Sequence, residues 1–473
     1  MSDTLSKHEI KAHAIDTLRE EIKPRKYVVN KIRVGSRLDE YANEVEEQCL
    51  KNDYISPDKY DELGVNLGLR DKNGNGVRTG LTNISKIISS EMIDGKKVSI
   101  DGKLWYRGYT IEQIIEDLQG EMGFEKVAYL LLFGEYPDEE KLTSFRGYIG
   151  HSRVLPTNFT RDVIMKAPTE DIMNSMTRSI LTLASYDKNT NDTSVSNVIR
   201  QSIQLIAQFP LLAVYGYNAY NYYEKHNSMF IHNADPRLST AENLLMMLRE
   251  DRQYTEVEAK TLDTALILHM EHGGGNNSTF TTRVVTSSGS DTYSTIAAAM
   301  SSLKGPRHGG ANIKVMDMIN DIRQNISDYE DEEQISNYLE KIVNKEAFDR
   351  KGLIYGMGHA VYSLSDPREK VFRDYVDKLA VEKNREHDLI LFKNIEKLAP
   401  IVIAKNRNIY KGVCPNIDFY SGFVYEMLGI PRELYTAIFA SARIVGWSAH
   451  RIEELICMNK IIRPAYISVM EEK

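Results

Sequence analysis

The stretch TEVEAKTLDTALILHMEH at residues 255–272 decides the fold class, because its apolar residues recur at helical spacing. Thr255 followed by Glu258 is a capping-box pattern, in which each side chain bonds to the backbone N–H of the other residue at the start of a helix. Leu262 and Leu266 follow one turn apart and predict one apolar face. Three glycines come directly after this stretch and are expected to end the helix.

The same spacing dominates the rest of the chain. Apolar residues recur every three or four positions in 432–457 and in the segment that begins at Ala311, while 123–134 and 202–214 are apolar enough to be buried helices. No 20–50-residue repeat is visible. The chain is therefore predicted to be mainly all-α.

Strand signals are confined to one region. KVSI at 97–100 and KLWYRGY at 103–109 are separated by Asp101-Gly102. An Asp-Gly pair between two such runs is a strong signal for a tight turn. We therefore expect one short N-terminal β-hairpin with its turn at these two residues.

Composition narrows the class of protein. The 473 residues are 42% hydrophobic, which is ample for a core, and their number predicts two or three domains. A net charge of −8 with scattered basic residues argues against nucleic-acid binding. Three cysteines far apart fit no disulfide framework and indicate the reducing cytoplasm. Neither a secretory signal nor a membrane span is expected, because no sufficiently long apolar run occurs.

Three short loops each present a side chain that can handle protons. They are GPRHGG at 305–310, GMGHAVY at 356–362 and PNIDFYSG at 415–422, which carry His308, His359 and Asp418. Two imidazoles and a carboxylate can remove a proton from one substrate while polarising a carbonyl of another. The three loops together predict an acid–base active site.

Each of these residues also has a structural explanation. His308 precedes a helix expected from Ala311, where a neutral imidazole that donates an N–H is favoured, but it could simply pack against the turn. Asp418 could be the N-cap of a helix over 419–428. Apolar neighbours would raise the pKa of Asp418 and backbone N–H donors would lower it, and the sequence leaves this balance open.

Further basic residues are candidates for binding an anion. His269 and His272 stand one turn apart without a third metal ligand; His269 continues the apolar face, whereas His272 lies nearer the glycines. Arg368 has the alternative of a surface pair with Asp366. Arg443 lies within an apolar helix, where either a bound carboxylate or a protein acid must compensate its charge.

Eight ordered segments of the chain resemble the citrate synthase family. They are LWYRGYTIEQI at 104–114, FEKVAYLLLFGEYP at 124–137, LILHMEHGGGNNSTF at 266–280, GPRHGGAN at 305–312, GMGHAVYSLSDPRE at 356–369, NIDFYSGFVYEMLGIP at 416–431, FASARIVGWSAH at 439–450 and IIRPAYISV at 461–469. The resemblance covers about residues 90–470 in family order, and leaves the first fifty or so without an obvious counterpart.

This resemblance implies a two-domain helical enzyme, usually a homodimer. Residues 1–50 would be an N-terminal helical extension, 51–311 with 417–473 the large domain, and 312–416 the small domain. The small domain would close over the substrates and expel water.

The resemblance also implies an acyltransferase that condenses acetyl-CoA with oxaloacetate and hydrolyses citryl-CoA to citrate and CoA. Asp418 would remove a proton from the methyl group of acetyl-CoA, and His308 would donate a hydrogen bond to the thioester oxygen. His359 would polarise the keto group of oxaloacetate. No metal and no cofactor is expected, since two imidazoles and several arginines supply the electrophilic stabilisation.

The implied binding residues fall into two sets. The oxaloacetate carboxylates would be held by His272, Arg368, Arg443 and, from the neighbouring subunit of the homodimer, Arg463. CoA would lie along the backbone of Gly356, Met357 and Gly358, with Lys411 a candidate for its phosphates.

The chain departs from the family pattern at three places. Glu271-His272-Gly273 stands where members often have an acidic residue, a His and then Glu. Ser363 replaces a common basic residue, and this puts one CoA phosphate contact in doubt. Arg307 stands beside His308 at a position that is usually small or apolar.

Three other functions compete with this one. A 2-methylcitrate synthase performs the same chemistry on propionyl-CoA, and one added methylene changes binding by only about 1–3 kcal/mol. A catalytically silent homologue could bind CoA or a dicarboxylate, and a metal-dependent hydrolase is the third option. The acyl preference, nucleotide control, assembly beyond a dimer and the role of the first fifty residues stay open.

Overall fold

The computed structural model describes residues 36–71, 76–94, 96–358, 361–406, 412–457 and 460–470. The chain forms two compact units, Met1–Thr79 with Pro464–Lys473, and Gly80–Arg463. Helices α2 (Ser36–Asn52) and α3 (Asp58–Glu62) belong to the first unit. The division of 51–473 into a large and a small domain stays a prediction.

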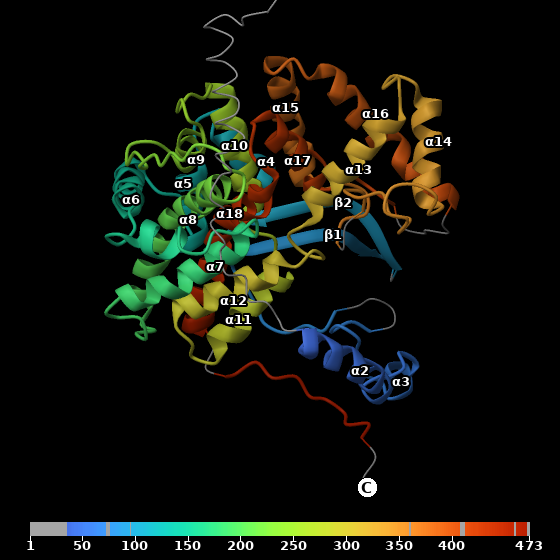
Figure 1. The fold of residues 1–473 in the computed structure, drawn as a ribbon, viewed down its shortest axis with the longest axis horizontal. Helices are drawn as coiled ribbons and strands as arrows, with labels where there is room; N and C mark the ends of the chain where they lie inside the picture. The colour runs from blue at the N-terminus through green and yellow to red at the C-terminus, as the bar shows by residue number, and fades with distance from the viewer. Residues whose placement is uncertain are drawn as a thin grey trace, which may run out of the picture. The chain divides into compact units, whose positions relative to one another are not determined.

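The second unit is almost entirely helical, as predicted (Figure 1). Its helices are α4 (Ile111–Asp117), α5 (Phe124–Phe133), α6 (Glu139–Ser152), α7 (Ile172–Leu183), α8 (Val195–Tyr223), α9 (Thr240–Leu248), α10 (Glu256–His269), α11 (Asn277–Ser287), α12 (Thr292–Lys304), α13 (Ala311–Asn325), α14 (Glu332–Val343), α15 (Pro367–Glu382), α16 (Glu386–Asn406), α17 (Ile417–Met427) and α18 (Tyr435–Cys457). Short helical turns η1 (Thr160–Ile164), η2 (Ala184–Tyr186) and η3 (Arg432–Leu434) accompany them.

Helix α10 begins as predicted and ends earlier. The Thr255 side chain accepts from the backbone of Glu258 and the Glu258 side chain accepts from the backbone of Thr255, so the capping box is confirmed. The helix ends at His269 rather than at 272. The hydroxyl of Tyr106 lies 3.2 Å from the carbonyl oxygen of Ile267 and 2.9 Å from that of Glu271, and it supplies a donor where the terminal carbonyls have none within the helix.

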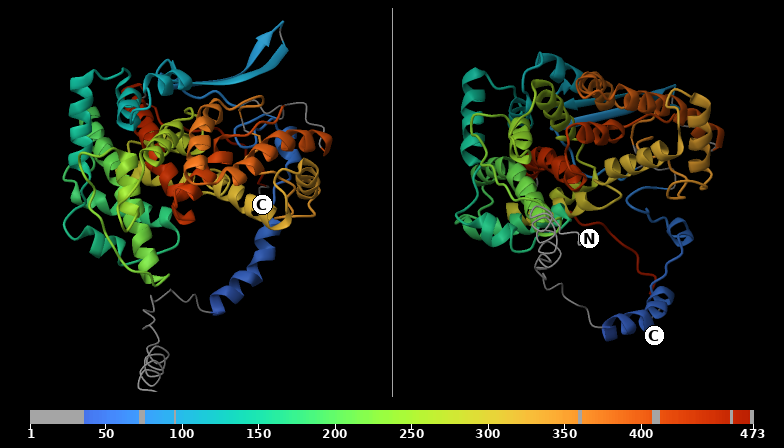
Figure 2. Two further views of the ribbon diagram at one scale, coloured as in Figure 1. Left: turned by 90° about the horizontal axis from the view of Figure 1, so that it is seen from above. Right: turned by 45° about the horizontal axis from the view of Figure 1, so that its top comes forward.

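The small sheet is placed differently from the prediction. Strand β1 (Ser85–Ile93) pairs antiparallel with β2 (Lys96–Tyr106), and β2 pairs with the two-residue β3 (Tyr109–Thr110). Asp101-Gly102 is therefore inside β2, at a bulge opposite Ile88 and Ser90, and the predicted turn there is wrong. The long hairpin projects from the helices in Figure 2.

Close packing explains the glycine at this bulge. A Cβ at Gly102 would lie 2.3 Å from the carbonyl oxygen of Ser365 and 2.5 Å from the Tyr362 ring. The Ser365 hydroxyl also accepts from the Gly102 N–H at 3.3 Å and donates to Asp101 at 2.7 Å. The segment before α15 thus packs directly against the Asp-Gly pair, and the chain does not turn there.

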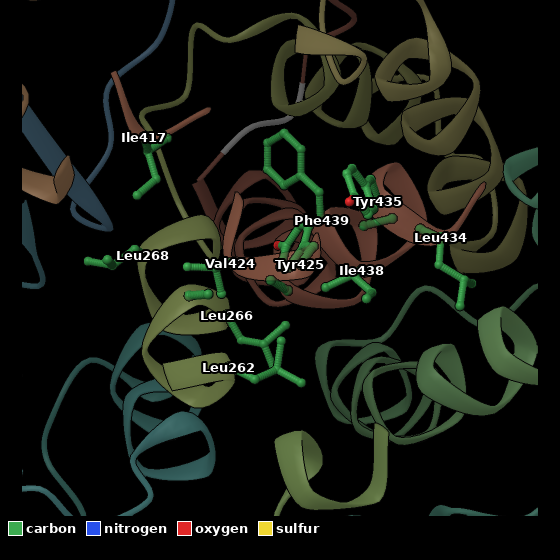
Figure 3. Packing of buried hydrophobic residues seen from close by; sticks show 14 of the residues in the cluster. Leu262, Leu266, Leu268, Ile417, Val424, Tyr425, Leu434, Tyr435, Ile438 and Phe439 are labelled. Atoms are coloured by element: carbon green, nitrogen blue, oxygen red, sulfur yellow. The ribbon is translucent and has the colours of Figure 1, made fainter. Parts of the chain in front are cut away.

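Three helices that carry candidate residues meet in one apolar core. Figure 3 shows Leu262 and Leu266 of α10 facing α18, with Val424 and Tyr425 of α17 beside them. Phe439 of α18 packs edge-on against the His269 ring, 4.8 Å between ring centres. This core fixes the ends of α10, α17 and α18 relative to one another. None of the helices in the described ranges is long and apolar enough to cross a membrane.

Candidate active site

Asp418 lies in the first turn of α17 and is not its cap. Asn416 is the N-cap, and its side chain accepts from the backbone N–H of Asp418 at 3.0 Å. The alternative of Asp418 as a structural N-cap is therefore wrong. Its carboxylate is left available for another task, in a half-buried position.

The glycine-framed loop at 356–358 is tied to the segment before α17. The Gly358 N–H donates to the carbonyl of Cys414 at 2.7 Å, and Asn416 bonds to the carbonyls of Gly356 and Gly358 at 2.9 and 2.8 Å. Gly356 has φ +79°, and a Cβ there would lie 2.9 Å from the Phe419 ring. This loop is therefore part of the support of Asp418. Contact of Gly356, Met357 and Gly358 with CoA stays a prediction.

The surroundings of Asp418 raise its pKa toward the range in which a carboxylate is an effective general base. Burial raises the pKa of Asp418 to about 6. The guanidinium groups of Arg368 and Arg443 act in the opposite direction and favour the carboxylate, while Asp366 favours the protonated form. The sequence left open whether the pKa of Asp418 is raised or lowered. In the structure, burial outweighs the two guanidinium groups and the pKa is raised.

His308 is held in one orientation by Ser278 at the start of α11. The backbone N–H of Ser278 points to Nε2 of His308 at 3.3 Å, and the Ser278 hydroxyl lies 2.9 Å from the same nitrogen. The indole N–H of Trp447 donates to that hydroxyl at 3.1 Å. Because Nε2 accepts from a backbone N–H, the ring proton belongs on Nδ1.

His308 is neutral at physiological pH, as predicted, although the cause differs from the one expected. Burial lowers the pKa of His308 to about 4, and the charge of Arg443 acts in the same direction. A neutral imidazole with its proton on Nδ1 can donate to an oxygen on which negative charge develops.

Arg443 is the charged residue that links these groups. Its side chain is only 2% exposed, and Nε donates to the carbonyl of His269 at the end of α10, 2.7 Å away. Its guanidinium lies over the Phe439 ring at 4.7 Å. Burial lowers the pKa of Arg443 to about 10, so it stays charged at neutral pH. No ion pair in the described part of the chain engages it, although the nearby Glu271 carboxylate favours its charged form, and a bound carboxylate at Arg443 stays a prediction.

Arg368 is also buried, with 4% of its surface exposed. The alternative of a pair with Asp366 at the surface is therefore wrong about the location. Asp366, the N-cap of α15, receives Nε and Nη2 of Arg368 at 3.0 and 2.7 Å. This bidentate pair presents a fixed, planar guanidinium next to Tyr362, whose ring centre lies 5.9 Å away. The pKa of Arg368 is raised, with burial opposing the attraction of Asp366.

The two neighbouring histidines have different roles. His269 Nδ1 lies 2.7 Å from the carbonyl of Ala265, and burial lowers the pKa of His269 to about 3, so it is the hydrogen-bonded core residue that was predicted. His272 lies beyond the helix end, 9% exposed, with its ring 5.5 Å from that of Tyr362. Tyr362 therefore contacts both His272 and Arg368.

The remaining predicted residues are His359, Lys411 and Arg463. His359 and Lys411 lie outside the described residues. Arg463 is exposed on the segment that follows α18, where the Ile462 N–H donates to Ser287 at 3.0 Å. Within the described residues, no three His, Cys, Asp or Glu side chains are gathered as a metal-ligand set.

Sequence reasoning missed the residues that orient the site. Ser278 and Trp447 fix His308, and Tyr106 fixes the end of α10. Ser278 follows Asn276, the N-cap of α11, by two residues, and this start of a helix directly after the glycines was a usable local signal. The contact from Trp447 spans 169 residues and has no local signal.

Sequence comparisons agree on one family. A family model for the C-terminal domain of citrate synthase matches residues 73–465. A citrate synthase from Synechocystis is 32% identical, covering 78% of this chain and 85% of that protein. A citrate synthase from Saccharolobus solfataricus is 31% identical over 84% of this chain and 97% of its own length. A 2-methylcitrate synthase from Shewanella oneidensis is 30% identical over 80% and 92%.

Solved structures show the same likeness. A ternary complex of carboxymethyl coenzyme A and oxaloacetate with citrate synthase from Thermoplasma acidophilum has a TM-score of 0.69 and 27% identity, covering 86% of this chain and 97% of the other. Citrate synthase from Pyrobaculum aerophilum has a TM-score of 0.69 and 26% identity, over 86% and 95%.

Proposed function

This chain belongs to the citrate synthase family, and we propose that Asp418, His308 and His359 carry out its reaction. It is an acyltransferase that joins the methyl carbon of acetyl-CoA to the keto carbon of oxaloacetate, then hydrolyses citryl-CoA to citrate and CoA. The observation that carries the residue assignment is geometric: Ser278 holds Nε2 of His308, and Asn416 rather than Asp418 caps α17, which leaves the Asp418 carboxylate uncommitted.

Asp418 acts as the base. Its carboxylate takes a proton from the methyl group of acetyl-CoA, and a pKa of about 6 leaves it ionised at neutral pH yet more basic than an exposed Asp. The proton moves to the carboxylate oxygen, and the electron pair of the C–H bond forms the enol or enolate.

His308 stabilises the charge that this step creates. Its Nδ1–H donates to the thioester oxygen, while Ser278 holds Nε2 on the opposite side of the ring. A preorganised donor of this kind costs no reorganisation when charge develops. The lowered pKa of His308, about 4 through burial and Arg443, keeps the ring neutral throughout.

Oxaloacetate is held by cations, and its ketone is polarised by His359. Arg368 and Arg443 are buried guanidinium groups that can pair with carboxylates, and His272 lies beside the Tyr362 ring that also contacts Arg368. The two carboxylates of a small dicarboxylate match the separate positive charges of Arg368 and Arg443, with His272 as a further donor. The enol carbon then attacks the polarised ketone, and water hydrolyses the resulting thioester.

A homodimer completes the site. Arg463 is exposed on an extended segment after α18, and this supports its insertion into the site of a second copy. Gly356, Met357, Gly358 and Lys411 are the proposed contacts with CoA. The reaction proceeds without a metal or cofactor, since cationic and imidazole groups supply the electrophilic stabilisation. Free thiols at Cys49 and Cys457 on the surface support a cytoplasmic location.

The deciding experiment compares acetyl-CoA with propionyl-CoA as partners of oxaloacetate, following thiol release. We expect a higher kcat/KM with acetyl-CoA and no effect of exhaustive chelation. A preference for propionyl-CoA would assign the chain to the 2-methylcitrate branch that its Shewanella relative represents. Absence of thiol release with both substrates would favour a silent binding protein.

A further inference from the structure

Glu271 and His450 form a buried pair behind the oxaloacetate residues. Their exposed fractions are 0% and 1%, and Nε2 of His450 lies 3.1 Å from Oε1 of Glu271. The Ser85 hydroxyl donates to the same carboxylate oxygen at 2.8 Å. On its other side His450 faces Glu453, with Nδ1 3.8 Å from a carboxylate oxygen. A carboxylate this deeply buried is stable as an anion only with such partners.

The backbone of Glu271 connects it to the binding site. The Tyr106 hydroxyl lies 2.9 Å from the carbonyl oxygen of Glu271 and 3.3 Å from its backbone nitrogen. His272 is the next residue, at the point where the chain leaves α10. The position of the Glu271 backbone therefore determines the position of the His272 Cα and Cβ atoms.

The charge of Glu271 connects it to the site in a second way. Of the groups that favour the charged form of Arg443, the Glu271 carboxylate has the largest influence and Asp418 a smaller one. Gly446, less than one turn after Arg443 on α18, lets the helix approach closely, since a Cβ there would lie 2.5 Å from Oε2 of Glu271. A buried guanidinium needs such a counter-charge before substrate arrives.

We propose that Glu271 is a positioning residue for oxaloacetate, an inference that rests on the proposed function. Its carboxylate balances the charge of Arg443 before the dicarboxylate binds, and His272 is the next residue along its backbone. His450 and Ser85 hold the carboxylate in place. Glu271 contacts no reacting atom, so it contributes to binding the dicarboxylate and not to the chemistry on acetyl-CoA.

A purely structural ion pair is the alternative, and α18 offers a matched example. Glu454 pairs with Arg283 at 3.1 Å, and their side chains are 3% and 8% exposed. This pair also joins α18 to an element that carries site residues, α11. The Glu454 carboxylate bonds to Arg283 and takes no part in the Glu271–His450 pair. Glu454→Gln is therefore the control for loss of a buried acid on this helix.

The experiment measures KM for each substrate, kcat and Tm for Glu271→Gln, Glu271→Asp and Glu454→Gln. We expect Glu271→Gln to raise KM for oxaloacetate at least about tenfold, with KM for acetyl-CoA and kcat within about twofold to threefold. Glu271→Asp keeps the charge and should recover most of this loss. Glu454→Gln should lower Tm without changing KM for oxaloacetate.

Two results would overturn the inference. One is an unchanged KM for oxaloacetate in Glu271→Gln, and the other is a parallel rise of both KM values that Glu454→Gln reproduces. If Glu271→Gln does not fold, His450→Gln, which keeps an N–H donor but not the imidazole, is judged by the same two criteria. Failure of the proposed function is distinguishable, because the wild-type chain would then release no CoA.

Discussion

The backbone N–H of Ser278 donates to Nε2 of His308 across 3.3 Å, and this one contact fixes which ring nitrogen of the imidazole carries the proton. A ring nitrogen that accepts a hydrogen bond carries no proton, so the proton is on Nδ1. The Ser278 hydroxyl, 2.9 Å from Nε2, and the Trp447 indole, 3.1 Å from that hydroxyl, support the same orientation. The start of α11 thus sets Nδ1–H as the donor that we propose for the thioester oxygen.

Removing the donor or its support should have graded effects. We expect His308→Ala to lower kcat about 10²–10³-fold, the usual loss for one donor to a developing oxyanion. Ser278→Ala keeps the backbone N–H and should cost about tenfold or less, because the tautomer is retained and only the hydroxyl support is lost. Thiol release measures both, with Thr281→Ala as control, since the half-buried Thr281 hydroxyl bonds to the carbonyl of Asn277 in its own helix. An equal loss of kcat in Ser278→Ala and His308→Ala would contradict this order.

Asp418→Asn tests the base. The amide keeps the shape of the side chain but cannot take the methyl proton, so kcat should fall about 10²–10⁴-fold. The helix should be unaffected, because Asn416 and not Asp418 caps α17. Thiol release gives the rate, and circular dichroism with Tm gives the fold. Turnover near that of the wild type would exclude Asp418 as the base.

The pH dependence follows from the same residue. The base acts as the carboxylate, and burial raises the pKa of Asp418 to about 6, so kcat/KM for acetyl-CoA should be constant above this value and fall about tenfold per pH unit below it. His308, with a pKa of about 4, is neutral over the whole range and adds no second transition. A pH series from 5 to 8, with Tm recorded at each pH, measures this. A constant kcat/KM down to pH 5 would contradict the raised pKa.

The start of α10 and the loops of the site could be predicted from the sequence because their signals are local. Thr255 and Glu258 are three residues apart, and glycine or proline frames His308 and Asp418 within their own loops. The role of Gly102 could not be predicted from the sequence, because it depends on Ser365, which lies 263 residues further on. An Asp-Gly pair predicts a turn only where nothing packs against it.

The same reasoning separates the candidate residues. Composition and spacing indicated that Arg443 needs a partner, but only the fold places its Nε on the carbonyl of His269. Ser278, Tyr106 and Glu271 were missed because their contacts with the site join segments far apart in the chain, and Ser, Tyr and Glu residues are too common to stand out alone.

Gly102→Ala tests the packing of the hairpin. A Cβ would lie 2.3 Å from the backbone oxygen of Ser365, so the strand or the segment before α15 must shift, at a cost of about 1–3 kcal/mol in the free energy of unfolding. Gly147→Ala is the matched control, because nothing lies within 4 Å of its Cβ position in α6. That change should stabilise by up to about 1 kcal/mol. Similar Tm values for the two variants would contradict the close approach.

Mixed dimers test whether Arg463 acts across the subunit interface. Asp418→Asn and Arg463→Ala should each be nearly inactive as homodimers. If Arg463 serves the site of its partner, a heterodimer of the two variants places both defects in one site and leaves the other intact. The purified heterodimer should then show about half of wild-type turnover, since one of its two sites works. If Arg463 serves its own subunit, each site of the heterodimer carries one defect and no activity returns. Co-expression with two different affinity tags, followed by thiol-release assays on the doubly tagged fraction, therefore decides which subunit supplies the arginine.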